Sequence, residues 1–261
     1  MRWQFYKYQG TGNDFVILDN RDQSYNQLTR EQVAFLCNRR FGIGGDGLMM
    51  LNEKEGYDFE MIYYNADGNK SSMCGNGGRC LVQFANHIGI KKEKYHFLAV
   101  DGEHEAYIKD DGTVALKMKD VKGIRNKDGN YIVDTGSPHY VCFEHDIDSI
   151  NVFAKGREIR YSPAFEGNGI NVNFIETTGR NDIIKVRTYE RGVEDETLSC
   201  GTGVTACAIV AAHNQAGFNH VEVITKGGSL SVEFDKKDDL FTNVWLMGAA
   251  IKVFEGSIEI D

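Results

Sequence analysis

Two short segments of this chain place a cysteine and several glycines directly before an apolar stretch of helical length. One segment reads MCGNGGRC from residue 73 and the other reads SCGTGVTAC from residue 199, so each half of the chain carries one. A cysteine at a helix N-terminus lies at the positive end of the helix dipole, beside backbone N–H groups that have no partner inside the helix. This position favours the thiolate form of Cys74 and Cys200, and two such thiols are able to face each other across a substrate.

The repetition also predicts two domains. At 261 residues the chain is long enough for two domains of ordinary size, each with its own core. Turn-forming residues gather between residues 119 and 130, about midway between the two cysteine segments, and we place the boundary there. The prediction is a first half, 1–120, that carries Cys74 and a second half, 121–261, that carries Cys200. Whether the last strand, about 250–261, returns to the first half stays open.

Alternation of apolar and polar residues predicts many short strands. Residues 1–8 alternate in this way, and the turn at Asp101-Gly102 predicts a hairpin between two strands. Only two prolines accompany 29 glycines, so the turns are expected to use Gly, Asn and Asp. The other strands are expected at 59–64, 95–100, 103–109, 114–118, 183–190, 221–225, 229–234, 241–247 and 250–258.

Three helices are expected among these strands. Residues 29–38 begin with a capping box of Thr29 and Gln32 and have the pattern of an amphipathic surface helix. Residues 78–88 and 203–216 follow the two cysteines, and the second of these stretches is apolar almost all round, which indicates burial. The predicted fold class is therefore α+β, with two similar strand-rich halves, each a curled, mostly antiparallel, barrel-like sheet around a central buried helix.

Charge and composition exclude several classes of partner. The formal net charge is −9 and no long basic run occurs, which speaks against binding to nucleic acid. The chain has no apolar stretch of about 18 residues, and its N-terminus alternates where a signal peptide would be uniformly apolar. We therefore expect a soluble, cytoplasmic protein without membrane contact, whose six cysteines are reduced thiols.

The six cysteines divide into two groups. Four lie inside apolar stretches, where a thiol behaves as a small buried hydrophobe, and these are Cys37, Cys80, Cys142 and Cys207. A metal site is not expected, because the cysteine spacings of six and seven residues do not match zinc-ligand pairs. A redox dithiol of Cys74 and Cys200 stays open, although neither belongs to a Cys-x-x-Cys motif.

Further polar residues are candidates for a binding site. The turns Gly75-Asn76 and Gly201-Thr202 open helices and suit a carboxylate or phosphate. Glu190 and Arg191 follow a predicted strand, where they are either a solvated pair or a tuning carboxylate beside a guanidinium that recognises carboxylates. Taken singly, the remaining candidates are also explained as turn or structural residues, and these are Asn13, Asn65, Asn171 and His139. The glycine-rich loop 42–47 lacks the lysine of a nucleotide-binding loop.

With these residues in place, the chain resembles the diaminopimelate epimerases from end to end. The resemblance rests on an ordered set of short motifs, and Asn76 stands where the related proline racemases typically have a histidine. The motifs are Gly-x-Gly-Asn-Asp-Phe at 10–15, Gly-Ile-Gly at 42–44, Asn-Ala-Asp-Gly at 65–68, the two cysteine segments, Pro-His at 138–139 and Tyr-Glu-Arg-Gly at 189–192.

The resemblance implies an amino-acid epimerase that uses no pyridoxal phosphate and no metal. One thiolate removes the α-proton of a diamino dicarboxylate and the other thiol protonates the opposite face, with Cys74 as base and Cys200 as acid for the L,L substrate. It implies two halves related by a pseudo-two-fold axis, an active site in the cleft between them, a homodimer, and a place in lysine and peptidoglycan-precursor biosynthesis.

The resemblance also assigns substrate contacts. The α-carboxylate would lie on the helix-opening turns at Gly75-Asn76 and Gly201-Thr202, and the remote carboxylate would pair with Arg191. Asn65 would help to hold the remote ammonium group. The other family substrate positions fall on Asn13, Asn171 and Glu190, and the groups that influence the cysteines fall on His139 and Glu190.

Three positions depart from the family pattern. Gly47 stands where a glutamine is frequent, and Ser137 stands where an asparagine commonly precedes Pro-His. The segment 192–197 is one residue longer than usual before the second cysteine. Two other functions therefore stay open: a proline or hydroxyproline racemase, and, in a different class, a non-catalytic anion-binding or thiol-redox protein.

Overall fold

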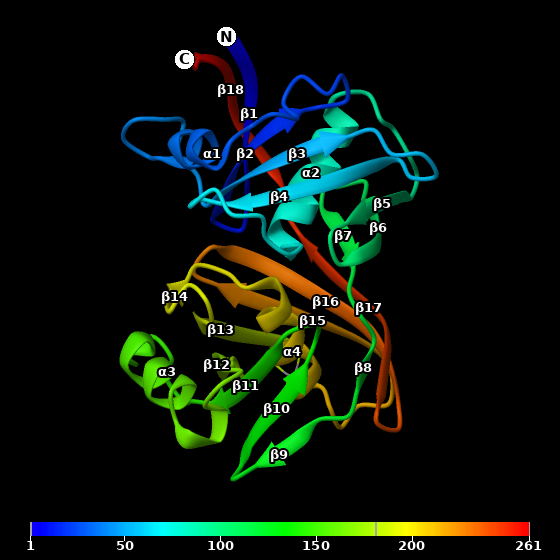
Figure 1. The fold of residues 1–261 in the computed structure, drawn as a ribbon. Helices are drawn as coiled ribbons and strands as arrows, with labels where there is room; N and C mark the ends of the chain where they lie inside the picture. Colours follow the sequence, from blue (N-terminus) through cyan, green and yellow to red (C-terminus); the bar gives the residue numbers. More distant parts are fainter. Residues whose placement is uncertain (1, 181, 261) are drawn as a thin grey trace. The chain divides into compact units, whose positions relative to one another are not determined.

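The chain folds into two compact units. A computed structural model describes residues 2–180 and 182–260. Unit 1 comprises the described residues of 1–116 and 248–261, and unit 2 comprises the described residues of 117–247 (Figure 1). The last strand thus belongs to unit 1, where β18 (Ile251–Glu259) runs antiparallel to β1 (Arg2–Gly10).

Unit 1 is a curled sheet with two helices. From β18 the sheet continues through β1 into β2, with antiparallel β1/β2 and then alternating parallel β2/β3, antiparallel β3/β4, parallel β4/β5 and antiparallel β5/β6 and β6/β7 pairs. The remaining elements are β2 (Asn13–Asp19), α1 (Arg30–Cys37), β3 (Gly47–Asn52), β4 (Phe59–Asn65), α2 (Gly75–His87), β5 (Tyr95–Ala99), β6 (Gly102–Ile108) and β7 (Val114–Lys117).

Unit 2 contains more elements but the same central arrangement. They are β8 (Val121–Lys122), β9 (Arg125–Lys127), β10 (Asn130–Asp134), β11 (Pro138–Phe143), α3 (Val152–Arg160), the 3-10 turn η1 (Pro163–Phe165), β12 (Asn171–Thr177), β13 (Ile183–Glu190), β14 (Asp195–Thr197), α4 (Gly201–Ala211), β15 (Gly217–Thr225), β16 (Gly228–Lys237) and β17 (Leu240–Gly248).

The two units repeat one topology. In unit 2 the pairs β10/β11, β11/β12, β12/β13, β13/β15 and β15/β16 are antiparallel, parallel, antiparallel, parallel and antiparallel, as are the five pairs from β1/β2 to β5/β6 in unit 1. The helices also correspond in order, since α1 and α3 follow the second strand of the series and α2 and α4 follow the fourth. Each strand and helix of this series in unit 1 thus has a topological equivalent in unit 2.

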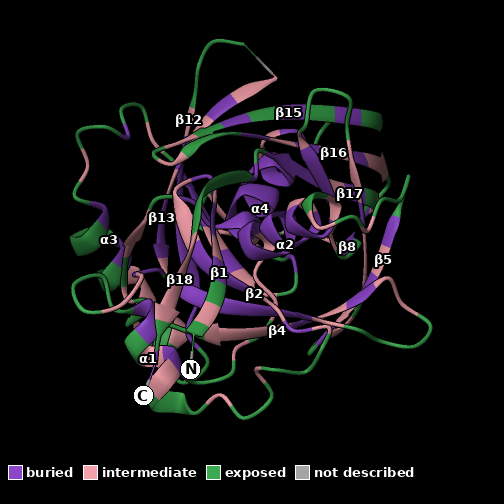
Figure 2. Cartoon of the chain, turned by 90° about the horizontal axis from the view of Figure 1, so that it is seen from above, coloured by how far each residue is buried: buried purple, intermediate pink, exposed green. Residues whose placement is uncertain are grey.

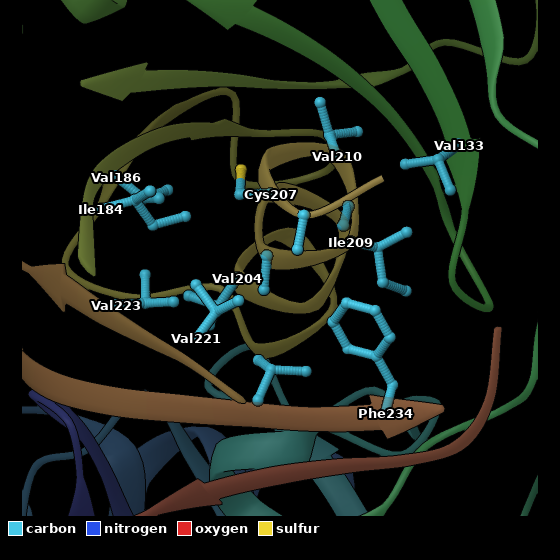
Figure 3. Packing of buried hydrophobic residues seen from close by; sticks show 14 of the residues in the cluster. Val133, Ile184, Val186, Val204, Cys207, Ile209, Val210, Val221, Val223 and Phe234 are labelled. Carbon is cyan, nitrogen blue, oxygen red and sulfur yellow. The ribbon is translucent and has the colours of Figure 1, made fainter. Parts of the chain in front are cut away.

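A buried helix lies at the centre of each unit. Figure 2 shows α2 and α4 coloured as buried over most of their length. In unit 2, Val204, Cys207 and Val210 on α4 pack within a cluster that includes Val223 and Phe234 (Figure 3). Burying one such aliphatic side chain stabilises the fold by about 1.5–3 kcal/mol. The predicted α+β class, with two strand-rich units each curled around a central helix, is confirmed.

Several local predictions agree with the structure, but the predicted bounds of two helices do not. The hairpin at 101–102 joins β5 to β6, and the Thr29–Gln32 capping box is formed in both directions at α1. The helices that follow the cysteines begin earlier than residues 78 and 203, because the glycines thought to form a preceding turn are the first turn of each helix. The second helix also ends at Ala211 and not at 216, because the polar residues from His213 onward form turns.

Helix α3 was not predicted from the sequence. Its buried residues are Val152 and Gly156, so it has almost no apolar stripe. Gly156 lets the helix lie against β13, since a Cβ there would stand 2.3 Å from Cβ of Tyr189. The repeated topology does indicate a helix here, because α1 occupies the equivalent place in unit 1.

Within the described residues, no helix is both long and apolar enough to cross a lipid bilayer.

Candidate functional site

In unit 1, strand register brings three candidate positions to one edge of the sheet. Gly47 begins β3, pairs with Asn65 at the end of β4, and lies opposite Phe15 of β2, two residues after Asn13. The N-terminus of α2 lies at the same edge, because Cys74 contacts Asn13 there. Asn65 is exposed at this edge and closes the turn that follows β4.

Cys74 is the N-cap residue of α2 and contacts the amide of Asn13, which also accepts from Asn76. Its Sγ donates to Oδ1 of Asn13 at 3.6 Å, and Nδ2 of Asn76 donates to the same oxygen at 3.4 Å. The cysteine side chain makes no capping hydrogen bond of its own to the first turn. The first backbone N–H groups of a helix have no intrahelical partner, so this end of α2 suits an anionic ligand.

A charged cluster fixes the orientation of Asn13. Its Nδ2 donates to Oδ2 of Asp46 at 2.6 Å, which leaves Oδ1 for Cys74. Arg39 bridges Asp46 and Asp14, and Lys7 pairs with Asp14 at 2.6 Å. Burial raises the pKa of Asp14, but hydrogen bonds and charges from Arg39 and Lys7 outweigh it and lower that pKa to about 2. Asp46 was not singled out in the sequence, since it contacts Asn13 only through folding.

In unit 2, the equivalent sheet edge carries different residues. His139 in β11 lies opposite Asn171, the first residue of β12, and Glu190 ends β13. Nδ2 of Asn171 donates to Oγ of Ser137 at 2.9 Å and to the carbonyl of Pro138 at 3.1 Å. Asn171 is thus a fixed group at this edge and not a free turn residue.

Arg191 is held beside Asn171. Its backbone N–H donates to Oδ1 of Asn171 at 2.9 Å, while its guanidinium donates to the carbonyl of Asn168 at 2.7 Å and to Oγ of Ser137 at 3.3 Å. A guanidinium has five N–H donors in a planar fork. The two guanidinium contacts orient the fork and leave donors that suit a carboxylate.

Cys200 is the N-cap residue of α4 and matches Cys74 in the repeat. Its Sγ lies 3.5 Å from Oγ1 of Thr202, and no side-chain hydrogen bond from Cys200 caps the helix. Oγ1 of Thr135 donates to the carbonyl of Thr202 at 2.9 Å, which ties this helix end to the segment that precedes β11. Gly201 and Thr202 form the first turn of α4, as Gly75 and Asn76 do in α2.

Below Cys200 lies a buried polar group that unit 1 lacks. Nδ2 of Asn173 donates to Nδ1 of His139 at 3.1 Å, and Oγ1 of Thr188 donates to Oδ1 of Asn173 at 2.9 Å. The register equivalents of His139 and Asn173 in unit 1 are the apolar Phe15 and Met49. The two thiols therefore lie above chemically different surroundings.

The His139 imidazole is neutral. Burial lowers its pKa to about 3, against a weaker opposing effect of the Asn173 hydrogen bond. Because Nδ1 accepts from Asn173, the single ring proton is on Nε2, and this atom has no hydrogen-bond partner within the part of the chain that the structure describes. His139 therefore shapes the Cys200 site without bringing a positive charge to it.

This neutral histidine predicts a pH dependence of stability. The unfolded chain binds a proton at His139 below pH 6.5 and the folded chain does not until about pH 3, so stability is lost as the pH falls. Between pH 6.5 and 5, we expect the free energy of unfolding to fall with a slope approaching about 1.4 kcal/mol per pH unit from this residue. Urea unfolding of the parent protein and of His139→Gln measures it, and the two slopes are expected to differ by that amount. Equal slopes would contradict the prediction.

Glycines in the first helical turns allow the helices to approach the sheets. A Cβ at Gly203 would stand 2.5 Å from Oδ1 of Asn173, and one at Gly77 would stand 1.9 Å from Cε of Met49. A Cβ at Gly10 of β1 would stand 3.1 Å from Sγ of Cys80. The glycines near the cysteines thus have a packing role besides any role in ligand binding.

The other four cysteines are buried in apolar surroundings. None of the six cysteines, all of which lie within the described residues, forms a disulfide bond. Burial raises the pKa of Cys37, Cys80 and Cys142 to about 12 and that of Cys207 well above its usual range. These four thiols are protonated and inert at neutral pH. Among the described residues, no group of three or more His, Cys, Asp and Glu side chains gathers in a way that would hold a metal ion.

Comparison with known proteins agrees with these motifs. The profile of the family described as diaminopimelate epimerase matches residues 5–123 and 131–253. The diaminopimelate epimerase of Flavobacterium psychrophilum is 46% identical over 98% of this chain and 100% of its own length. That of Chlorobaculum tepidum is 42% identical over 96% of this chain and 99% of its own length.

The chain belongs to the diaminopimelate epimerase family. It is therefore an isomerase of the amino-acid racemase and epimerase type. Solved structures share the fold at low identity. A PhzF-family phenazine biosynthesis protein from Bacillus anthracis superposes with a TM-score of 0.77 at 14% identity, covering 100% of both chains. A hydroxyproline epimerase from Agrobacterium vitis gives a TM-score of 0.66 at 13% identity, covering 100% of this chain and 93% of its own.

The structure explains how this family member tolerates its departures. A Cβ at Gly47 would stand 2.5 Å from both Cε2 of Tyr63 and the carbonyl of Tyr64, so this backbone has no room for a side chain there. Ser137 holds Asn171 and Arg191 through its single hydroxyl oxygen. The longer segment 192–197 forms a turn closed by Glu194 N–H to the Glu190 carbonyl at 2.8 Å, followed by β14.

Proposed function

We propose that the chain interconverts L,L- and meso-2,6-diaminoheptanedioate, with Cys74 and Cys200 as its paired proton carriers. The observation that carries this proposal is the repeated one: in each unit the N-cap residue of the central buried helix is a cysteine whose side chain makes no capping hydrogen bond to that helix. Inversion at a carbon requires one group that removes a proton and another that delivers a proton to the opposite face. Two equivalent units, each with one such thiol, can supply both.

In the proposed reaction, the C–H bond at the α-carbon of the L,L substrate breaks as the Cys74 thiolate takes the proton. The electron pair stays on the substrate as an enolate-like carbanion, and the S–H of Cys200 donates a proton to the other face. Cys74 ends as the thiol and Cys200 as the thiolate, so the reverse reaction exchanges their roles. A cysteine has a reference pKa of about 8.5, so modest tuning makes both forms accessible near neutral pH.

Backbone groups would stabilise the charge that develops. The α-carboxylate and its enolate-like form would accept hydrogen bonds from N–H groups in the first turns at Gly75-Asn76 and Gly201-Thr202. The remote carboxylate would bind the Arg191 guanidinium, which Ser137 and Asn168 already orient. Asn13, Asn171 and Glu190 would complete the contacts, and Asn65 would help to hold the remote ammonium group. Holding both ends of the substrate fixes the α-carbon near the sulfurs.

The proposal is tested by exchange of the α-proton with solvent. The purified, reduced protein is incubated in D₂O with L,L-diaminopimelate, meso-diaminopimelate, L-proline and trans-4-hydroxy-L-proline in parallel, and deuterium at the α-carbon is followed by NMR. Exchange and epimerisation of the two diaminopimelates, unchanged by added pyridoxal phosphate, are expected. Labelling of proline without diaminopimelate would favour the related racemase function, and ligand binding without exchange would favour a non-catalytic thiol protein.

We also propose a compartment and an assembly. Six cysteines without a disulfide bond fit a reducing compartment such as the cytoplasm. A homodimer is the assembly that the family resemblance implies, and β18 exposes three large apolar residues that a second copy would cover, namely Ile251, Val253 and Phe254.

A further inference from the structure

Arg79 on α2 is a fully buried cation without a carboxylate partner. Its relative exposure is 0%, and none of the ion pairs among the described residues includes it. Its Nε has no hydrogen-bond partner in the part of the chain that the structure describes. A buried, unpaired charge is costly, so its presence calls for a group that benefits from the positive charge.

The hydrogen bonds of Arg79 all lead to the helix end that carries Cys74. Nη2 donates to Oδ1 of Asn76 at 3.1 Å and to Oγ1 of Thr11 at 2.9 Å, and Nη1 lies 3.4 Å from the carbonyl of Gly75. Because Oδ1 of Asn76 accepts from Arg79, Nδ2 of Asn76 is turned toward Asn13, which contacts Cys74. The guanidinium is thus linked to the Cys74 sulfur through the amides of Asn76 and Asn13.

The repeat provides an internal comparison. Arg79 follows Cys74 by five residues, and the residue five positions after Cys200 is Thr205. Thr205 is also fully buried, and its hydroxyl donates to the carbonyl of Gly201 at 2.9 Å, much as Arg79 does to Gly75. The same helical position therefore carries a charge in unit 1 and a neutral hydroxyl in unit 2.

The other charged side chains on and near the strands that pack against α2 have ion-pair or hydrogen-bond partners. Lys7 on β1 and Arg39 are paired with Asp14 on β2 and with Asp46, which makes two positive and two negative charges. On β18 Lys252 pairs with Glu255, and on β6 Glu103 and Glu105 pair with His96 and Lys94. Cys80 on α2 is a protonated thiol, since burial raises its pKa to about 12. Arg79, by contrast, is fully buried and has no ion pair among the described residues.

We propose that Arg79 is a positioning residue that favours the thiolate form of Cys74 and aligns the Asn76 amide with Asn13, so that Cys74 and not Cys200 is the resting proton acceptor. Burial lowers the pKa of Arg79, and coupling to Cys80 and Cys74 opposes that shift, as expected if the cation and the Cys74 sulfur interact. The accepting oxygen of Asn13 favours the S–H form. The two influences keep both forms of Cys74 accessible, as a reversible proton carrier needs.

The inference rests on the proposed function only in naming Cys74 a proton carrier. The ionisation of the Cys74 thiol is measurable without substrate. Peptide-resolved alkylation by iodoacetamide between pH 5 and 10 reports the thiolate fraction of each cysteine separately. In Arg79→Met we expect the midpoint for Cys74 to rise by at least about one pH unit, which is a tenfold smaller thiolate fraction near neutral pH. In Arg79→Lys the midpoint is expected to stay near that of the parent protein.

Two further variants separate the charge from the packing. Arg79→Gln keeps a donor for Asn76 but removes the charge, so it is expected to shift the Cys74 midpoint as Arg79→Met does. If Arg79→Met does not fold, Arg79→Gln takes its place in the experiment. Thr205→Val is the matched control in α4 and is expected to leave Cys74 unchanged. Replacing a buried unpaired charge by an apolar side chain need not destabilise the fold.

Enzyme kinetics supply the second measurement. The acid limb of the pH profile of kcat/KM for the L,L substrate reports the base of the free enzyme, and we expect it to move to higher pH in Arg79→Met with the alkylation midpoint. An unchanged Cys74 midpoint in both neutral variants would overturn the inference, as would an equal shift at Cys200. Either result leaves the solvent-exchange test of the function unaffected, so the two proposals fail separately.

Discussion

Replacing either Cys74 or Cys200 by alanine is expected to lower the epimerisation of diaminopimelate by at least about a thousandfold in both directions. Removing a positioned acid or base typically costs roughly 10²–10⁴-fold in rate. A variant that lacks one of the two thiols has no base for one direction of the reaction and no proton donor for the other. The double variant is expected to lose little more than either single one, because residues that act as a unit are not additive.

The repeat supplies matched controls for this experiment. Cys80 and Cys207 lie on the same two helices, six and seven residues beyond the proposed carriers, and both are buried thiols whose pKa is raised by burial. Cys80→Ala and Cys207→Ala are expected to keep most of the activity. The assay is a coupled measurement of meso product, with circular dichroism to verify folding. Near-full turnover by Cys74→Ala or Cys200→Ala would rule out a two-thiol reaction.

The residues predicted best from the sequence are those whose role is local. A cysteine before an apolar helix defines an N-cap by spacing alone, and so does the Thr29–Gln32 capping box. By contrast, β2, β3 and β12 were not predicted. Each is buried along most of its length and lies in a parallel pair, so the alternation that marks a half-exposed strand is absent.

The candidate site shows the same limit. The sequence does not identify three residues of the site, because their contacts with the other site residues form only when the chain folds. These residues are Asp46, Arg79 and Asn173. Asp46 lies 33 residues from Asn13, and Asn173 lies 34 residues from His139. An alignment of the two repeats draws attention to two of them. When Cys74 is aligned with Cys200, Arg79 falls opposite Thr205, and when the strands are aligned, Asn173 falls opposite Met49.

Arg191 is expected to distinguish a diamino dicarboxylate from a simple amino acid. Its guanidinium is oriented by Ser137 and Asn168, and its remaining donors would bind the remote carboxylate in the proposed function. Loss of one partner of a buried charge pair costs about 2–5 kcal/mol. We therefore expect Arg191→Gln to lower kcat/KM for diaminopimelate by roughly 30- to 5,000-fold. Arg191→Lys is expected to recover part of that loss, because a lysine keeps the charge but not the bidentate fork.

Lysine provides the control, because it is diaminopimelate without one carboxylate. If Arg191 acts on the remote carboxylate alone, slow α-proton exchange of lysine is expected to be the same in the parent enzyme and in Arg191→Gln. The variant should then discriminate little between the two substrates, since the parent enzyme's preference for diaminopimelate comes from this contact. Equal loss on both substrates would mean that Arg191 supports the fold of the Asn171 edge, to which its backbone N–H is bonded, and not the recognition of a second carboxylate.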